Sequence, residues 1–127
     1  MDFVYLVTLL LLIQYVFFAM KTGMARGKDT VVAPATSGDE KYERAFRVQM
    51  NTLEQLIIVL PAMIICALSF RADVAAILGA IFLVTRFIYA AAYMKDPKTR
   101  ALGFVSGFFA TIALLLCSLY GVIMQLV

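Results

Sequence analysis

The sequence predicts an all-α integral membrane protein, a bundle of four helices forming a single domain over residues 1–127. Hydrophobic residues make up 64% of the chain, and the mean hydropathy of +0.95 is far above that of a soluble globular domain. Four stretches reach or approach the roughly 20 apolar residues that cross a hydrocarbon core as a helix. A chain of 127 residues has room for one such bundle and little else.

The spanning helices are expected at about 3–22, 46–70, 74–94 and 102–126. The first follows "MDF", which lacks the positive charge of a secretory signal, so we interpret it as a spanning helix. The second begins in polar sequence and becomes apolar at "LIIVLPAMIICALSF". Residues 23–45 form the expected loop, and a hinge at 71–73 and a polar turn at 94–100 separate the later helices. Near the start of the last helix, Gly103 and Gly107 form a pair of small residues that predicts close helix packing or a contact between copies of the chain in a trimer.

Lysine and arginine are concentrated at one end of the predicted bundle. They flank the loop and the polar turn at Lys21, Arg26, Lys28, Lys41, Arg44, Arg47, Lys95, Lys98 and Arg100. Only Arg71 lies near the opposite end. Because cytoplasmic loops of membrane proteins carry the excess of Lys and Arg, both termini are expected on the side away from the cytoplasm. This topology accounts for the net charge of +3, so no nucleic-acid partner is expected.

Several chemistries are excluded by residue usage. The chain has no histidine, which excludes Ser-His and Cys-His nucleophiles and an axial haem histidine. Cys66 and Cys117 lie in separate apolar helices, where free cysteine acts as a small hydrophobe, and they form no zinc or iron-sulfur motif. We therefore expect no metal. Any catalysis must depend on Arg, Tyr, Glu or a bound co-substrate.

A polar stripe runs along the start of the second predicted helix. At about 3.6 residues per turn, Arg44, Arg47, Asn51 and Glu54 share one face. A charge near the centre of a spanning helix costs roughly 2.5–3.5 kcal/mol even on lenient insertion scales. This face therefore needs a partner or a wet cavity instead of lipid.

The third predicted helix carries a second stripe of Arg86, Tyr89 and Tyr93. Arg100 follows about two helical turns beyond Tyr93, near the cytoplasmic mouth. The simple interpretation is structural: Arg86 pairs with Glu54, and the tyrosines belong to an interfacial belt. In that case, the remaining cations only set topology. The alternative is a shared cavity, in which arginines that outnumber the one carboxylate bind an anionic guest.

The stretch "ERAFRVQMNTLEQ" resembles the signature of the MAPEG family, the membrane-associated proteins of eicosanoid and glutathione metabolism. The pattern E-R-x-x-R-x-Q-x-N-x-x-E is matched by Glu43, Arg44, Arg47, Gln49, Asn51 and Glu54. The later stretch "RFIYAAAYMKDPKTR" is also similar to the family's third helix and the turn after it. The resemblance covers nearly the whole chain.

This resemblance implies a homotrimer with glutathione bound between subunits, at sites open toward the cytoplasm. Arg47, Asn51 and Glu54 would hold the tripeptide, with Gln49 beside them. Tyr89 and Tyr93 would contact it from a neighbouring subunit. Arg44 and Arg86 would support the site. Arg26 looks like a family arginine that grips a glutathione carboxylate, although a topology charge fits it equally well, and Arg100 matches the catalytic arginine directed at the sulfur.

The implied activity is that of a glutathione transferase or peroxidase, acting on hydrophobic electrophiles from the membrane lipids. Gln55 stands where leukotriene-forming members have tyrosine, so the chain looks more like bacterial members of the family. A bacterial inner membrane is therefore the expected location. The alternative function is a non-catalytic lipid-binding scaffold of the same family, against which the retained Arg100 argues.

Overall fold

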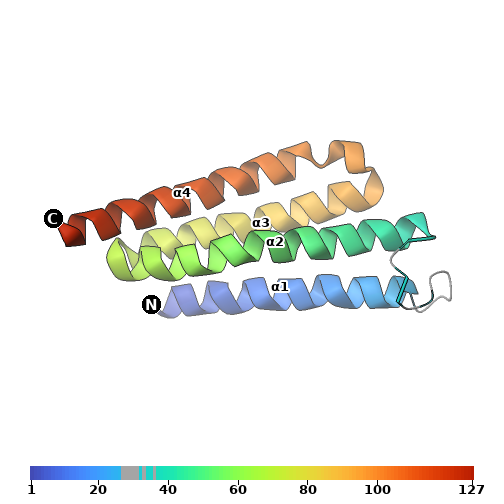
Figure 1. Cartoon of the computed structure of the whole chain (residues 1–127), viewed down its shortest axis with the longest axis horizontal. Helices are drawn as coiled ribbons and strands as arrows, with labels where there is room; N and C mark the ends of the chain where they lie inside the picture. The colour runs from blue at the N-terminus through green and yellow to red at the C-terminus, as the bar shows by residue number, and fades with distance from the viewer. Residues whose placement is uncertain (27–31, 33, 36) are drawn as a thin grey trace.

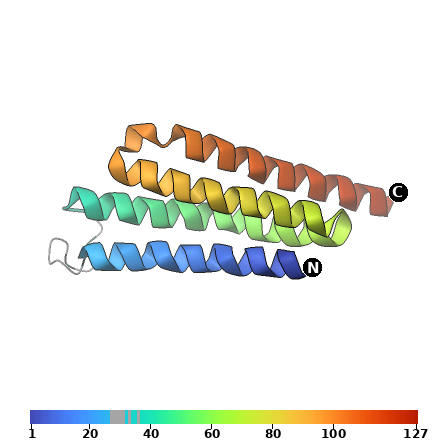
Figure 2. The ribbon, with the colours of Figure 1, turned by 180° about the vertical axis from the view of Figure 1, so that it is seen from behind.

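Four long helices run up and down in the computed structural model, which describes residues 1–26, 32, 34–35 and 37–127 (Figure 1). They are α1 (Asp2–Arg26), α2 (Glu40–Ser69), α3 (Ala72–Lys95) and α4 (Ala101–Leu126), with a short 3-10 turn, η1 (Pro97–Thr99), before α4. The middle helices α2 and α3 each pack against the other three, while α1 and α4 flank them (Figure 2). The described part of the chain contains no strand. The predicted all-α architecture of four apolar helices is confirmed.

Each helix is long and apolar enough to cross a membrane. The four contain 25, 30, 24 and 26 residues, and their most apolar windows have mean hydropathies of 2.0 to 2.3. Their outward faces carry large exposed apolar side chains, including Phe3, Phe109 and Leu116. A soluble protein rarely exposes apolar surface on this scale. The fold therefore fits an integral membrane protein.

Both chain termini lie at the same end of the bundle, opposite the α1–α2 and α3–α4 connections (Figure 1). We call the end that holds these two connections the charged end, because the lysines and arginines predicted to flank them gather there. Lys28 lies outside the described residues.

The helices extend further into polar sequence than apolarity alone predicted. Helix α1 continues to Arg26, past the expected end near residue 22, and α2 begins at Glu40, before the expected start near 46. Asp39 caps α2 by accepting a hydrogen bond of 2.9 Å from the backbone N–H of Tyr42. A capping carboxylate stabilises the orphan N–H groups of a first turn whether or not that turn is apolar. The expected loop over 23–45 is therefore shorter, and seven of its residues (27–31, 33 and 36) lie outside the described part.

The core is made of interlocking apolar side chains and a few glycines that let helices touch. Leu11, Met63 and Leu114 are fully buried at its centre. A Cβ placed on Gly103 would lie 2.5 Å from the backbone nitrogen of Tyr89, and one on Gly107 would lie 2.9 Å from the hydroxyl of Thr85. The predicted close packing at this pair is confirmed, and its partner is α3 of the same chain.

We predict that Gly103→Ala destabilises the protein, because the added methyl overlaps the α3 backbone. Overpacking of this kind costs about 1–3 kcal/mol, which exceeds the roughly 0.5–1 kcal/mol that alanine gains over glycine in a helix. Thermal unfolding in detergent, followed by circular dichroism, measures the effect. Gly23→Ala is the matched control, because a Cβ at Gly23 meets nothing within 4 Å. Equal melting temperatures for the two variants would contradict the close α3–α4 contact.

Candidate functional site

A polar cavity of about 550 Å³ opens at the charged end of the bundle, between α2, α3 and the start of α4. Its size falls within the range of small-molecule sites. The cavity is lined by Arg47, Asn51, Tyr89, Tyr93, Lys98, Arg100, Ala101, Phe104 and Val105. Five of the residues predicted to form a site are thus brought together within a single chain.

Helix α2 contributes Arg47 and Asn51, which are one helical turn apart. The other two members of the predicted stripe, Arg44 and Glu54, do not line the cavity. Glu54 is exposed and does not line the cavity, although it lies on the next turn. Arg44 points toward the end of α3 instead. The helical spacing placed these residues on one face correctly, but the face is wide enough for its members to meet different neighbours.

Arg86 is the most deeply buried charge in the described structure, with 1% of its surface exposed. Its Nη2 donates to Asn51 Oδ1 at 2.8 Å and to Thr52 Oγ1 at 3.0 Å, so it joins α3 to α2. Its guanidinium also lies 4.2 Å from the centre of the Tyr89 ring. A buried guanidinium is stable only with such partners. Arg86 therefore holds two side chains of the cavity wall, Asn51 and Tyr89, from the buried side of the bundle.

The structural interpretation, in which Arg86 pairs with Glu54, is wrong. The ion pairs among the described residues are Arg44–Glu40 and Arg71–Asp73. The amide oxygen of Asn51 and the hydroxyl of Thr52 supply the acceptors in place of a carboxylate. Glu54 remains exposed on the outer side of α2.

The tyrosines reach the cavity because α3 and α4 pack closely at Gly103. Tyr89 is buried and Tyr93 is half-buried, with ring centres 5.7 Å apart. The ring centre of Phe104 lies 6.3 Å from that of Tyr89, so α4 contributes an aromatic side chain to the cavity wall. Both tyrosines were expected to meet glutathione from a neighbouring subunit, yet they line the same cavity as Arg47 of their own chain.

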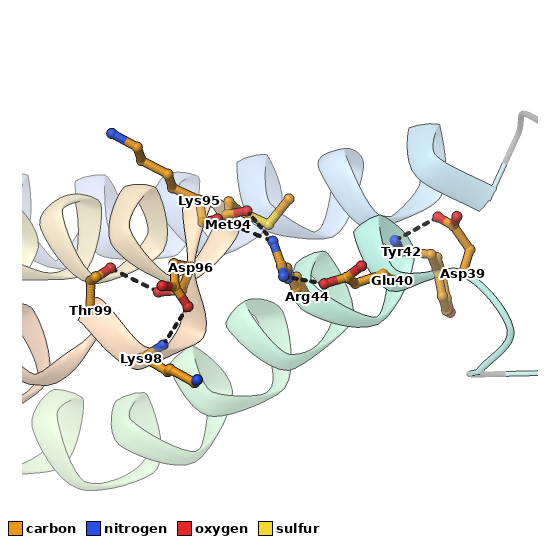
Figure 3. A network of polar contacts seen from close by, with 9 residues as sticks. All are labelled: Asp39, Glu40, Tyr42, Arg44, Met94, Lys95, Asp96, Lys98 and Thr99. Atoms are coloured by element: carbon orange, nitrogen blue, oxygen red, sulfur yellow. Dashed lines mark hydrogen bonds and ion pairs between the residues drawn. The ribbon is translucent and has the colours of Figure 1, made fainter.

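Arg100 lies at the cavity edge, at the residue that precedes α4. Its Nη1 donates to the backbone oxygen of Pro97 at 2.7 Å, and the rest of the side chain is exposed. Lys98 belongs to η1 and lines the same edge. The turn is held by Asp96, which accepts from the N–H of Lys98 at 3.1 Å (Figure 3). The two cations are thus presented by a short, hydrogen-bonded turn.

Arg44 has a structural role at the charged end. Its Nη1 donates to the backbone oxygens of Met94 and Lys95 at 3.1 and 3.2 Å, and it forms an ion pair with Glu40 (Figure 3). The final carbonyls of a helix lack partners within that helix, and cations stabilise them. Arg44 therefore ties the start of α2 to the end of α3.

Two residues predicted to bind glutathione lie on the α1 side, away from the cavity. Arg26 donates a hydrogen bond to the hydroxyl of Tyr42, and its Cζ lies 4.6 Å from the centre of the Tyr42 ring. Gln49 donates to the hydroxyl of Tyr15 at 3.2 Å. A single chain therefore does not bring these two side chains to Arg47 and Arg100.

The cavity is electrostatically suited to an anion. Arg47, Lys98 and Arg100 line it, and none of its lining residues is a carboxylate. Guanidinium and ammonium groups bind carboxylates through charge-assisted hydrogen bonds. From the sequence, Lys98 is expected only to set topology, and neither Phe104 nor Thr52 is among the predicted site residues. The spacing of Phe104, one turn beyond Arg100, was a usable signal, whereas nothing in the sequence marked Thr52.

Fold and cavity together define a four-helix membrane protein with a cation-lined polar cavity at one end of its bundle. The sequence profile of the MAPEG family matches residues 4–120. The chain belongs to the MAPEG family, as its helix-two signature predicted.

Named relatives connect this family to glutathione. The chain is 39% identical over 121 residues to the uncharacterized protein sll1147 of Synechocystis sp., and the match covers 95% of this chain and 88% of that protein. It is 34% identical over 91 residues to microsomal glutathione S-transferase 2 of Bos taurus, covering 72% of this chain and 62% of the transferase. It therefore spans less than two thirds of that relative. Leukotriene C4 synthase of Cavia porcellus is 30% identical over 94 residues, or 74% of this chain and 63% of the synthase. These relatives support a glutathione-related function in the membrane.

We predict energetic coupling between Arg86 and Asn51. Arg86→Met should lower stability by about 1–3 kcal/mol, because it leaves buried acceptors unpaired. In a double-mutant cycle with Asn51→Leu, unfolding in detergent should show a coupling of about 1 kcal/mol. Gln49→Leu breaks a hydrogen bond on the α1 side and should be additive with Arg86→Met within about 0.5 kcal/mol. Additivity of Arg86→Met with Asn51→Leu would refute the contact.

Proposed function

We propose that this protein is a membrane-bound glutathione transferase, with glutathione peroxidase activity toward lipid hydroperoxides. The observation that carries the proposal is the convergence of Arg47, Asn51, Tyr89, Tyr93 and Arg100 on one cavity. Glutathione is a small peptide with two carboxylates and one ammonium group, so it is an anion at neutral pH. The family relationship supports the choice of this anion.

Glutathione binding would use the two sides of the cavity differently. Arg47 and Lys98 would pair with carboxylates, and Asn51, held by Arg86, would hydrogen-bond the peptide groups. Glu54, exposed one turn beyond Asn51, would attract the ammonium group. Fixing these contacts before the ligand arrives lowers the entropic cost of binding.

Arg100 would activate the thiol. A thiol with a pKa of about 8.5 is mostly protonated at neutral pH, and a nearby guanidinium favours the thiolate, which is the nucleophile. The released proton would pass to water at the open mouth of the cavity. The hydroxyl of Tyr89 or Tyr93 could hydrogen-bond the same sulfur.

The second substrate would enter from the bilayer. Phe104 and Val105 form an apolar wall of the cavity on α4, which suits a hydrophobic electrophile. Attack by the thiolate on carbon forms a C–S bond and displaces a halide or opens an epoxide, whose oxygen takes up a proton. With a hydroperoxide, the thiolate attacks the terminal oxygen and the O–O bond breaks, which forms a glutathione sulfenic acid and an alkoxide that takes up a proton to leave as an alcohol. The thiol of a second glutathione then attacks the sulfenic acid sulfur, which forms the disulfide and releases water.

The complete site would be shared between copies of the chain, in a homotrimer. Arg26 and Gln49 lie on the α1 side of their own chain, so they would complete the cavity of a neighbouring subunit. The charged end would face the cytoplasm, where the positive-inside rule places it. A bacterial inner membrane remains the proposed location.

We predict that glutathione bound to the wild-type protein ionises about one to three pH units below free glutathione, because a nearby cation stabilises the anion. The ultraviolet absorbance of the thiolate, followed against pH with detergent-purified protein, measures this shift. Arg100→Ala should abolish it, whereas Lys95→Ala should retain it. Lys95 is the matched control, because it is a cation of the same end that does not line the cavity.

Two results would oppose the proposal in different ways. Normal thiolate formation in Arg100→Ala would remove the activating role from that residue. Absence of glutathione binding by the wild-type protein would favour the alternative function, a non-catalytic lipid-binding scaffold.

We predict that two inactive variants complement each other in mixed oligomers. Co-expressed Arg26→Ala and Arg100→Ala chains with different tags should regain part of the transferase activity, because some interfaces combine an intact Arg26 with an intact Arg100. Oligomers carrying both tags are purified and assayed with a hydrophobic halide. Arg47→Ala mixed with Arg100→Ala is the control without recovery, because the cavity takes both residues from one chain. Equal activities of the two mixtures would refute the shared site.

A further inference from the structure

A second concave feature, the α1–α3 slot, lies between α1 and α3 with α2 behind it. Its volume is about 240 Å³, and it shares no lining residue with the polar cavity. In the view of Figure 2, α3 lies in front of α2 and α1 runs beside them. The slot thus occupies a different face of the bundle from the proposed glutathione site, and the inference below does not depend on that proposed function.

The inner part of the slot is shaped for hydrocarbon. The ring of Phe87 lies edge-on to the rings of Phe17 and Phe18, with ring centres 6.5 and 6.0 Å apart. These three rings form one wall of the slot. Buried Val48 and Ala90 lie against its base. Small residues here leave room between the helices for a chain of methylene groups.

The outer part of the slot is cationic. Lys21 borders it, with its ammonium 5.3 Å from the centre of the Phe17 ring. Toward the charged end, the slot adjoins a second hollow that is lined by both Lys21 and Lys41. A third hollow beside it is lined by Lys41 and Lys95. Within the described residues, none of these three lysines forms an ion pair. The nearby carboxylate of Glu40 is already paired with Arg44.

We propose that the α1–α3 slot binds an anionic phospholipid of the surrounding leaflet. One acyl chain lies between Phe17, Phe87 and Ala91, and the phosphate lies between Lys21 and Lys41. The match is one of charge and direction: the apolar part faces the bilayer interior and the lysines lie at the charged end, which is the order of groups along a phospholipid. A soluble anion would leave the apolar part unfilled. A zwitterionic lipid would gain less than an anionic one from lysines that form no ion pair among the described residues.

The proposal is tested by native mass spectrometry of the protein released from mixed micelles containing phosphatidylglycerol or phosphatidylcholine. The wild-type protein should retain phosphatidylglycerol at a concentration about tenfold lower than phosphatidylcholine. The double variant Lys21→Gln with Lys41→Gln should lose this preference. Arg71→Gln, which removes a cation at the opposite end, should keep it.

A second pair of variants tests the apolar part of the slot. Ala91→Phe fills it and should lower retention of both lipids, whereas Leu116→Phe adds a ring on the exposed face of α4 and should not. Equal retention of the two lipids by the wild-type protein would overturn the proposal. A change of oligomer mass in Ala91→Phe without loss of lipid would also overturn it, because the slot would then be a contact between copies of the chain.

Discussion

The buried contact of Arg86 with Asn51 and Thr52 is the constraint on which the rest of the site depends. A guanidinium in the apolar middle of a bundle must have acceptors, and this one finds them on α2 while its face stacks on Tyr89. The contact sets the rotation of α3 relative to α2. Arg47 and Asn51 on one helix, and Tyr89 and Tyr93 on the other, consequently line the same cavity.

The glycine contact at the start of α4 complements that tether. Gly103 lets α4 lie against the backbone at Tyr89. Because the chain reaches α4 through the short turn η1, this approach also brings Lys98 and Arg100 to the cavity edge. The Arg86 contact and the close approach at Gly103 therefore act together. The first orients the cavity wall formed by α2 and α3, and the second sets the distance of Arg100 from that wall.

Cations at the charged end fall into three physical groups with different consequences. Arg44 donates hydrogen bonds to the carbonyls at the end of α3 and forms an ion pair with Glu40. Arg47 and Arg100 face the polar cavity. Lys21 and Lys41 lie beside an apolar slot on another face and form no ion pair within the described part of the chain. They share a sign and an end of the bundle, but their neighbours determine which anion each group can bind.

The sequence by itself determined the four helices and the family, because apolar stretches long enough to span a bilayer and the ordered polar signature are both local patterns. It also predicted Arg47, Asn51, Tyr89, Tyr93 and Arg100 as site residues, and the structure shows that all five line one cavity. Only the tertiary structure decided the partner of Arg86, the structural role of Arg44 and the position of Arg26 and Gln49 on a different face. Helical spacing fixes which residues share a face, whereas the rotation and distance between packed helices fix what each residue meets.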